Sequence, residues 1–146
     1  MDMGAVRPAI RRAELPDMKA CAGLYVGIGR ADFQWRPRSY FRADDFLGYA
    51  EHEDVWVADR EGAVVGFLTY FAPEHFLHYL FVAPAARGEG IGSALLAYAR
   101  SHYGAPHSLK VDVPNEAARR FYERLGYVEA GTGEMDGVDW IELRSP

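Results

Sequence analysis

A glycine-rich turn in the second half of the chain has the composition of an anion-binding site. Its glycines are Gly88, Gly90 and Gly92, and it follows an apolar run that ends at Pro84. A segment with helical patterning begins directly after the turn, so the first N–H groups of that helix lack intrahelical partners and lie at its positive end. Glycine also lets a phosphate approach the main chain closely, because it has no Cβ atom. The turn therefore predicts a phosphate-binding loop.

Two common phosphate-binding motifs do not fit this turn. The dinucleotide-binding fingerprint Gly-x-Gly-x-x-Gly, read from Gly88, needs a third glycine at the position that Ser93 holds. The nucleotide-hydrolase P-loop needs a lysine, and the chain has none between Lys19 and Lys110. A tight strand-to-helix turn without a ligand is the remaining alternative for these glycines.

A second segment, further along the chain, has the signals of a short capped helix. Asn115 is a good N-cap residue, Glu116 suits the positive end of a helix, and Gly126 suits the position that ends one. Apolar residues between them, including Phe121 and Tyr122, repeat at helical spacing, which indicates one buried face. From the residues alone, Asn115 is a helix cap and Tyr122 is either a core aromatic or a functional hydroxyl.

Together the two segments resemble the signature of the Gcn5-related N-acetyltransferases. Arg87, Gly90 and Gly92 match the family's pyrophosphate loop, Arg-x-x-Gly-x-Gly. The residues that match its second motif, Asn-x-x-Ala-x-x-Phe-Tyr-x-x-x-Gly-Phe, are Asn115, Ala118, Phe121, Tyr122 and Gly126. Tyr127 stands where phenylalanine is usual. The two motifs occur in the family's order and spacing.

The resemblance implies direct transfer of an acetyl group from acetyl-coenzyme A (acetyl-CoA) to a primary amine of a small molecule or peptide, within a ternary complex. In the family, the tyrosine faces the coenzyme sulfur, so Tyr122 is expected to protonate the leaving thiolate. Pantetheine pairs with the strand before the loop like an added strand, and the N–H near Val82 would serve the oxyanion. The implied cofactor-binding residues are Leu80, Phe81, Val82, Arg87, Gly88, Glu89, Gly90, Ile91, Gly92, Ser93, Asn115 and Tyr122.

The general base requires a separate argument. Many family members carry a glutamate eleven residues before the arginine of the loop, where this chain has Phe76, which cannot accept a proton. His78 follows two residues later, and strand alternation places it on the same face as Phe76, Leu80 and Val82. A neutral imidazole accepts a proton near pH 7. His78 is therefore expected to be the base or a substrate contact, and a histidine packed between strands is the alternative.

Other side chains complete the expected acceptor site. Glu74 and His75 begin the same strand and could relay a proton through water, so the base stays open among these two, His78 and water. Aromatic faces hold a cation or an aryl group, and Arg36 or Arg38 could pair with a carboxylate. Packing between helices is the alternative for the aromatic residues. The expected substrate-binding residues are Phe33, Trp35, Arg36, Tyr40 and His78.

Length and composition indicate one domain, residues 1–146, of 146 residues with net charge −5. The negative charge opposes nucleic-acid binding and favours cationic partners. The first ten residues lack a leader pattern, and no apolar run is long enough to span a membrane. A single cysteine, Cys21, allows no internal disulfide, so the cytoplasm is the expected location. The histidines show no metal-ligand spacing, so no metal is expected. Dimers are common among such folds, which leaves a homodimer open.

Hydrophobic periodicity and turn residues predict the elements that position these motifs. Strands are expected at 9–13, 55–59, 63–70, 75–82, 108–113, 127–130 and 138–143. Helices are expected at 16–30, 44–51, 90–103 and in the segment after Asn115. This order predicts an α/β (α+β) fold in which about four helices flank a mixed, mostly antiparallel sheet of six to seven strands. The resemblance identifies it as the acyl-CoA N-acyltransferase fold, in which one parallel pair of strands splays apart.

Two other functions compete with acetylation of a small amine. A protein N-terminal or lysine acetyltransferase would need an open groove, whereas a small-molecule enzyme would close the aromatic loop over its site. A non-catalytic acyl-CoA sensor would bind the coenzyme without turnover. The presence of Tyr122 counts against the sensor, and Phe76 at the usual glutamate position counts for it.

Overall fold

The computed structural model describes residues 6–146; the first five residues, part of the stretch predicted to contain no leader, lie outside the described part. The strands are β1 (Ala9–Arg12), β2 (Asp54–Arg60), β3 (Ala63–Phe71), β4 (Phe76–Val82), β5 (Ser108–Asp112), β6 (Val128–Met135) and β7 (Val138–Arg144). The α-helices in this part of the chain are α1 (Asp17–Asp32), α2 (Ala43–Ala50), α3 (Ile91–Tyr103) and α4 (Glu116–Arg124). None of them combines the length and the apolar run that crossing a bilayer requires.

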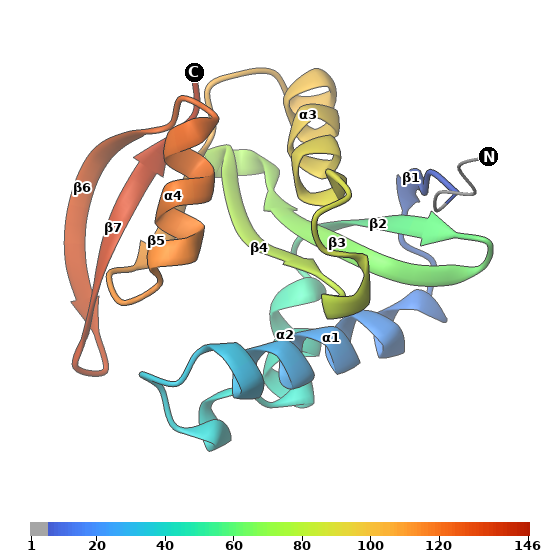
Figure 1. The fold of residues 1–146 in the computed structure, drawn as a ribbon, viewed down its shortest axis with the longest axis horizontal. Helices are drawn as coiled ribbons and strands as arrows, with labels where there is room; N and C mark the ends of the chain where they lie inside the picture. Colours follow the sequence, from blue (N-terminus) through green and yellow to red (C-terminus); the bar gives the residue numbers. More distant parts are fainter. Residues whose placement is uncertain (1–5) are drawn as a thin grey trace.

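The strands form one seven-stranded sheet in the order β1-β2-β3-β4-β5-β7-β6 (Figure 1). Every neighbouring pair is antiparallel except β4 and β5, which are parallel. This arrangement confirms the expected fold class, including the number of strands and the flanking helices. It also places the strand that precedes the glycine-rich turn at the centre of the sheet.

The two faces of the sheet carry separate hydrophobic cores because side chains alternate along β2 and β3. Val57 and Phe67 point toward α1 and α2, whose buried residues complete the core on that side. Trp56 and Leu68 point the other way, into a core that includes residues of α3 and α4. The sheet therefore separates the α1–α2 layer from the layer that carries both sequence motifs (Figure 1).

The parallel strands β4 and β5 pair at only one end. Phe76 pairs with Ser108, whose N–H donates to the His75 carbonyl at 2.9 Å, and the pairing stops there. The two strands then diverge, as Figure 1 shows. The Ala83 N–H donates to Val65 on β3, so odd-numbered residues near this end of β4 bond to β3. The main-chain groups of Leu80 and Val82 therefore point into the gap, whereas those of Phe81 are directed at β3.

A β-bulge lies in β4 at His78, where the register with β3 skips one residue. Because of this extra residue, His78 and Tyr79 project to the same side, and their rings stack with centroids 4.0 Å apart. The expectation that His78 shares a face with Leu80 and Val82 is wrong. Those two side chains pack against the α3–α4 core, while His78 turns toward α2.

The C-terminal hairpin is longer than the sequence analysis predicted, since β6 continues to Met135 instead of ending at Ala130. Its turn consists of Asp136 and Gly137, both with positive φ. Such turns match the right-handed twist of the strands, so pairing continues up to the turn itself. The tip of the hairpin thereby lies on the side of the molecule where the acceptor site is expected.

Candidate active site

The glycine-rich turn begins α3 with its main-chain donors unclaimed. Gly88 and Gly90 have φ of +81° and +79°, a left-handed conformation that favours glycine. The first hydrogen bond of the helix runs from the Ala94 N–H to the Gly90 carbonyl at 3.0 Å. Within residues 6–146, no protein acceptor takes the N–H groups of residues 88–93. These donors are available to an anion at the positive end of the helix.

A cleft of about 770 Å³ lies in front of this loop and extends along β4 to α4. Glu89 does not line it, because its carboxylate pairs with Arg60. The predicted residues that do line it are Leu80, Phe81, Val82, Arg87, Gly88, Gly90, Ile91, Gly92, Ser93, Asn115 and Tyr122. Unclaimed amides at one end and the free edge of β4 at the other fit the pyrophosphate and pantetheine of acetyl-CoA.

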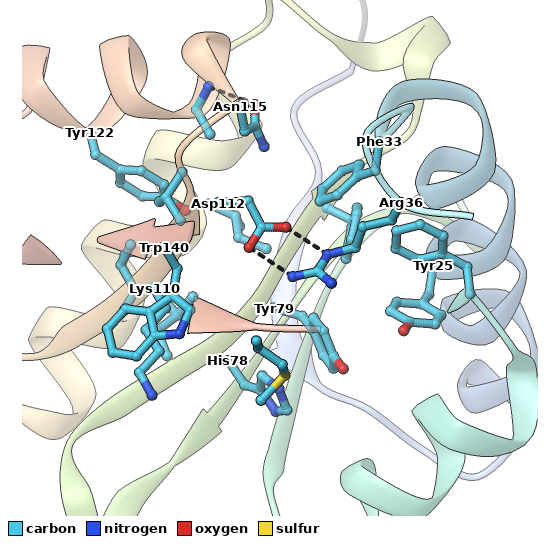
Figure 2. Close-up of a pocket in the computed structure, with 18 of the residues that line it drawn as sticks. Tyr25, Phe33, Arg36, His78, Tyr79, Lys110, Asp112, Asn115, Tyr122 and Trp140 are labelled. Atoms are coloured by element: carbon cyan, nitrogen blue, oxygen red, sulfur yellow. Dashed lines mark hydrogen bonds and ion pairs between the residues drawn. The ribbon is translucent and has the colours of Figure 1, made fainter. Parts of the chain in front are cut away.

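A second cavity, of about 300 Å³, lies at the gap between the diverging strands, against α1 and the segment that follows it (Figure 2). Its walls are mainly aromatic side chains from the segment after α1, from β4 and from the C-terminal hairpin. The residues that line both this cavity and the cleft are Phe33, Leu80, Phe81, Asn115, Ala118 and Tyr122. The two spaces therefore meet at the gap between β4 and β5.

A buried ion pair connects the segment after α1 to the end of β5. The Nε of Arg36 donates to Asp112 Oδ2 at 2.8 Å and its Nη2 to Oδ1 at 3.1 Å, as Figure 2 shows. The indole N–H of Trp35 donates to the same carboxylate at 2.9 Å, and the Arg36 guanidinium lies over the Tyr40 ring. Arg36 is thus already paired and not free for a substrate carboxylate, and Trp35 lines neither cavity. Phe33, Arg36 and Tyr40 do line the smaller cavity.

Tyr122 and Asn115 occupy the junction of the two spaces. Tyr122 comes from the buried face of α4, and burial raises the pKa of its hydroxyl, which keeps it protonated at neutral pH. Asn115 caps α4, since its Oδ1 accepts the Ala118 N–H at 3.2 Å. Its side chain faces both spaces while it caps the helix. A proton donor therefore stands where the cleft and the cavity join.

His78 lines the smaller cavity and has a carboxylate partner that the sequence analysis missed. Its Nδ1 lies 2.9 Å from Oε2 of Glu53, which is buried just before β2. No local pattern marks Glu53, because it belongs to an acidic surface-like run and reaches His78 only through the folding of α2 against β4. Glu74 and His75, the other candidate bases, are exposed and line neither cavity.

The sequence analysis also did not identify a cation–π contact in the smaller cavity. The ammonium of Lys110 lies 4.3 Å from the ring centroid of Trp140, and both residues line the smaller cavity. The indole packs directly on Gly133, where a Cβ atom would overlap it. Strand pairing between β5, β7 and β6 creates this wall. Within residues 6–146, no three His, Cys, Asp or Glu side chains form a group able to hold a metal ion.

Comparisons with known proteins agree with this geometry. Residues 51–129 match the family model described as "Acetyltransferase (GNAT) domain". The chain is 34% identical to the peptidyl-lysine N-acetyltransferase YiaC of Escherichia coli, over 81% of this chain and 82% of that one. It is 36% identical to the 5-NmdU N-acetyltransferase of Pseudomonas phage PaMx11, over 59% of this chain and 66% of that one.

The fold is also that of a solved acetyltransferase. The solution structure of apo-form YjaB from Escherichia coli superimposes with a TM-score of 0.82 at 22% identity, covering 95% of this chain and 97% of that one. This likeness concerns the fold, whereas the family model and YiaC concern the sequence itself. Because the model matches more than half of the chain and YiaC matches most of it, the chain belongs to the GNAT family and is an acetyl-CoA-dependent N-acetyltransferase.

Proposed function

We propose that this enzyme transfers the acetyl group directly from acetyl-CoA in the cleft to a small amine in the aromatic cavity. The observation that carries this proposal is that the two spaces share lining residues at the gap between the splayed strands, among them Leu80 and Tyr122. Donor and acceptor can then react face to face in a ternary complex. The only cysteine, Cys21, is fully buried and burial raises its pKa to about 12, so it is unsuited to carry the acetyl group.

The chain's own groups divide the work of binding. The amides of residues 88–93 hold the pyrophosphate, and the main-chain groups of Leu80 and Val82 pair with pantetheine in the gap. The Val82 N–H, which faces the gap, serves as the donor to the developing oxyanion. Arg87 forms an exposed ion pair with Asp32 at 2.7 Å, which orders the rim of the cleft. Acetyl-CoA supplies the activated acyl group when bound.

Two side chains move the protons. His78 accepts the proton of the acceptor amine, because it is the imidazole that lines the cavity and the usual glutamate position is Phe76. Tyr122 donates a proton to the leaving thiolate, since burial keeps its hydroxyl protonated and places it at the junction. The two transfers together give a neutral amide and a neutral thiol as products.

The acceptor cavity favours a small amine with a flat apolar group. Its volume of about 300 Å³ and its aromatic walls suit such a molecule. The Arg36–Asp112 ion pair holds the segment after α1 across one side, so the space is a pocket and not an open groove. Asp112 is the one carboxylate among the lining residues of the described chain, and Arg36 neutralises it. A polycationic acceptor would therefore find no free counter-charge.

A lysine side chain of a peptide is the second candidate acceptor. The similarity to a peptidyl-lysine N-acetyltransferase favours it, because an extended side chain is slender enough to enter a narrow pocket. The similarity to a 5-NmdU N-acetyltransferase supports a small-molecule acceptor instead. The pocket geometry favours the small-molecule acceptor over the lysine side chain.

A thiol-release assay separates the candidates. Purified protein with acetyl-CoA is given 2-phenylethylamine, spermidine or a lysine-containing peptide, and free thiol is followed over time. We expect kcat/KM for 2-phenylethylamine to exceed that for the other two at least tenfold. A preference for the peptide would replace the small-molecule proposal with the peptidyl-lysine one. Calorimetric binding of coenzyme A without thiol release from any amine would identify a sensor, and absence of binding would refute the cleft assignment.

A further inference from the structure

We infer that Glu53 is a positioning residue that holds His78 in the one tautomer and orientation able to take a proton from the acceptor amine. This inference rests on the proposed role of His78 as the base. Glu53 lies outside both sequence motifs and lines neither the cleft nor the cavity. Its action would therefore be exerted through His78 alone.

The contact between the two side chains defines the tautomer. Nδ1 of His78 lies 2.9 Å from Oε2 of Glu53. An ionised carboxylate only accepts hydrogen bonds, so Nδ1 must carry the proton and donate it. Nε2 then keeps its lone pair and is the ring nitrogen left for the cavity that His78 lines. A general base needs this division of roles between its two nitrogens.

The burial of Glu53 favours a functional role over a stabilising one. Its side chain is only 6% exposed, and its Oε1 is buried without a hydrogen-bond partner. A buried carboxylate with an unsatisfied oxygen costs folding free energy, and such exceptions in native structures need an explanation. Within residues 6–146, the ring of His78 is the one hydrogen-bond partner of this side chain. Orientation of that ring explains why the cost is tolerated.

The backbone and the neighbouring rings fix the imidazole in the same place. The bulge in β4 turns His78 toward α2, and without it the ring would point into the core beside Leu80. The ring stacks on Tyr79 with an interplanar angle of 15° and meets the Tyr49 ring edge-on at 5.0 Å. Three separate elements, α2, the turn after it and β4, thus converge on one imidazole.

Polar and charged groups face the ring from several elements. Glu53 faces it from the turn after α2, and the phenols Tyr49 and Tyr79 face it from α2 and β4. Lys110 on β5 is the nearby cation, with Nζ 5.8 Å from the Phe76 ring that borders His78. The carboxylate is in direct contact with the ring and the ammonium is more distant, so Glu53 is the closer electrostatic partner of His78.

The proton transfer balances without a further reactant. The acceptor nitrogen forms its bond to the acetyl carbon, the carbon–sulfur bond breaks, and the nitrogen's proton passes to Nε2 of His78. Glu53 accepts the Nδ1–H hydrogen bond throughout and does not itself take the proton. The imidazolium then gives its proton to solvent, and the Tyr122 phenolate takes one up from solvent, so both side chains return to their starting states. Tyr122 supplies the proton of the thiol, as proposed above.

The test combines a spectroscopic readout with kinetics on the intact protein. In ¹⁵N-histidine-labelled protein at pH 7.5, the His78 ring is expected to give the single pattern of the Nδ1–H tautomer, and Glu53→Gln is expected to mix the two tautomers. With 2-phenylethylamine as acceptor, Glu53→Gln should lower kcat about 10²-fold. The KM for acetyl-CoA should stay within about twofold of the parent value. Glu53→Asp, which keeps the charge, should recover part of kcat.

Two comparisons distinguish loss of His78 positioning from a general structural effect of the substitution. Glu51→Gln, an exposed glutamate at the end of α2, is the matched control and should change neither readout. In a His78→Asn background, Glu53→Gln should have almost no further effect, because coupled residues are not additive. Equal losses from Glu53→Gln in both backgrounds, or an unaltered His78 tautomer, would overturn the inference.

Failure of the inference and failure of the proposed function give different results. If parent protein releases thiol and His78→Asn leaves kcat unchanged, His78 is not the base and the role of Glu53 is overturned, while acetyl transfer stands. If the parent protein releases no thiol with any amine, the proposed function fails. The tautomer measurement still decides whether Glu53 orients His78, since it requires no turnover.

Discussion

Buried His107 makes the folding stability of this protein sensitive to acid. The residue is 1% exposed, and its Nε2 lies 2.7 Å from the hydroxyl of Tyr127. Its Nδ1 is buried without a partner, so a proton there would meet no acceptor. Burial, with smaller contributions from the charges of Arg100 and His75, lowers the pKa of His107 from 6.5 to about 4.

The sign and size of the effect follow from this pKa. The unfolded chain takes up the proton near pH 6.5, and the folded chain only near pH 4. Between these values the unfolded state binds more protons, so stability is retained above pH 6.5 and falls as the pH drops. At about 1.4 kcal/mol per pKa unit, the full loss is about 3 kcal/mol. Between pH 7.5 and pH 5.0 the expected share is about 2 kcal/mol.

The assay is urea unfolding of the parent protein and of His107→Gln at pH 7.5 and pH 5.0. Glutamine can still bond to the Tyr127 hydroxyl but does not titrate. The parent should therefore lose about 2 kcal/mol more than the variant between the two pH values. His52→Gln, at an exposed site, is the matched control and should behave like the parent. Equal losses for the parent and His107→Gln would refute the view that burial keeps this imidazole neutral.

Three further substitutions probe the packing and the site. Gly29→Ala should lower the unfolding free energy by about 1–3 kcal/mol in urea titrations, because its Cβ would overlap the phenylalanine ring packed on this turn of α1; Gly27→Ala, with open space around it, should not. Gly90→Ala should weaken coenzyme A binding in calorimetry about tenfold. Gly62→Ala replaces an equally left-handed glycine in a distant turn and should leave the affinity unchanged. Equal affinities of the Gly90→Ala variant and the parent protein would count against the loop assignment. Tyr122→Phe should lower kcat about 10²-fold with little change in the KM for acetyl-CoA, and unaltered kinetics would remove this hydroxyl from the mechanism.

Features set by neighbouring residues could be read from the chain alone. The Asn115 cap on α4 and the left-handed Gly126 that follows the helix were both expected and are both present. The strand–loop–helix around Gly90, the element order and the sheet class were predicted as well. These features depend on a few adjacent residues, whose caps, turns and periodicity are governed by short-range sterics and hydrogen bonding.

The arrangement of the acceptor side was decided by the tertiary structure. The face that His78 occupies depends on how β4 pairs with β3, since one inserted residue reverses the alternation. Glu53 contacts His78, and Asp112 forms an ion pair with Arg36, only because distant segments pack together. Long-range pairing carries no local sequence signal. It decides which way a side chain points where the local sequence is compatible with more than one direction. The sequence thus determined the family and the glycine-rich turn before α3, and folding determined how the cavity beside β4 is built.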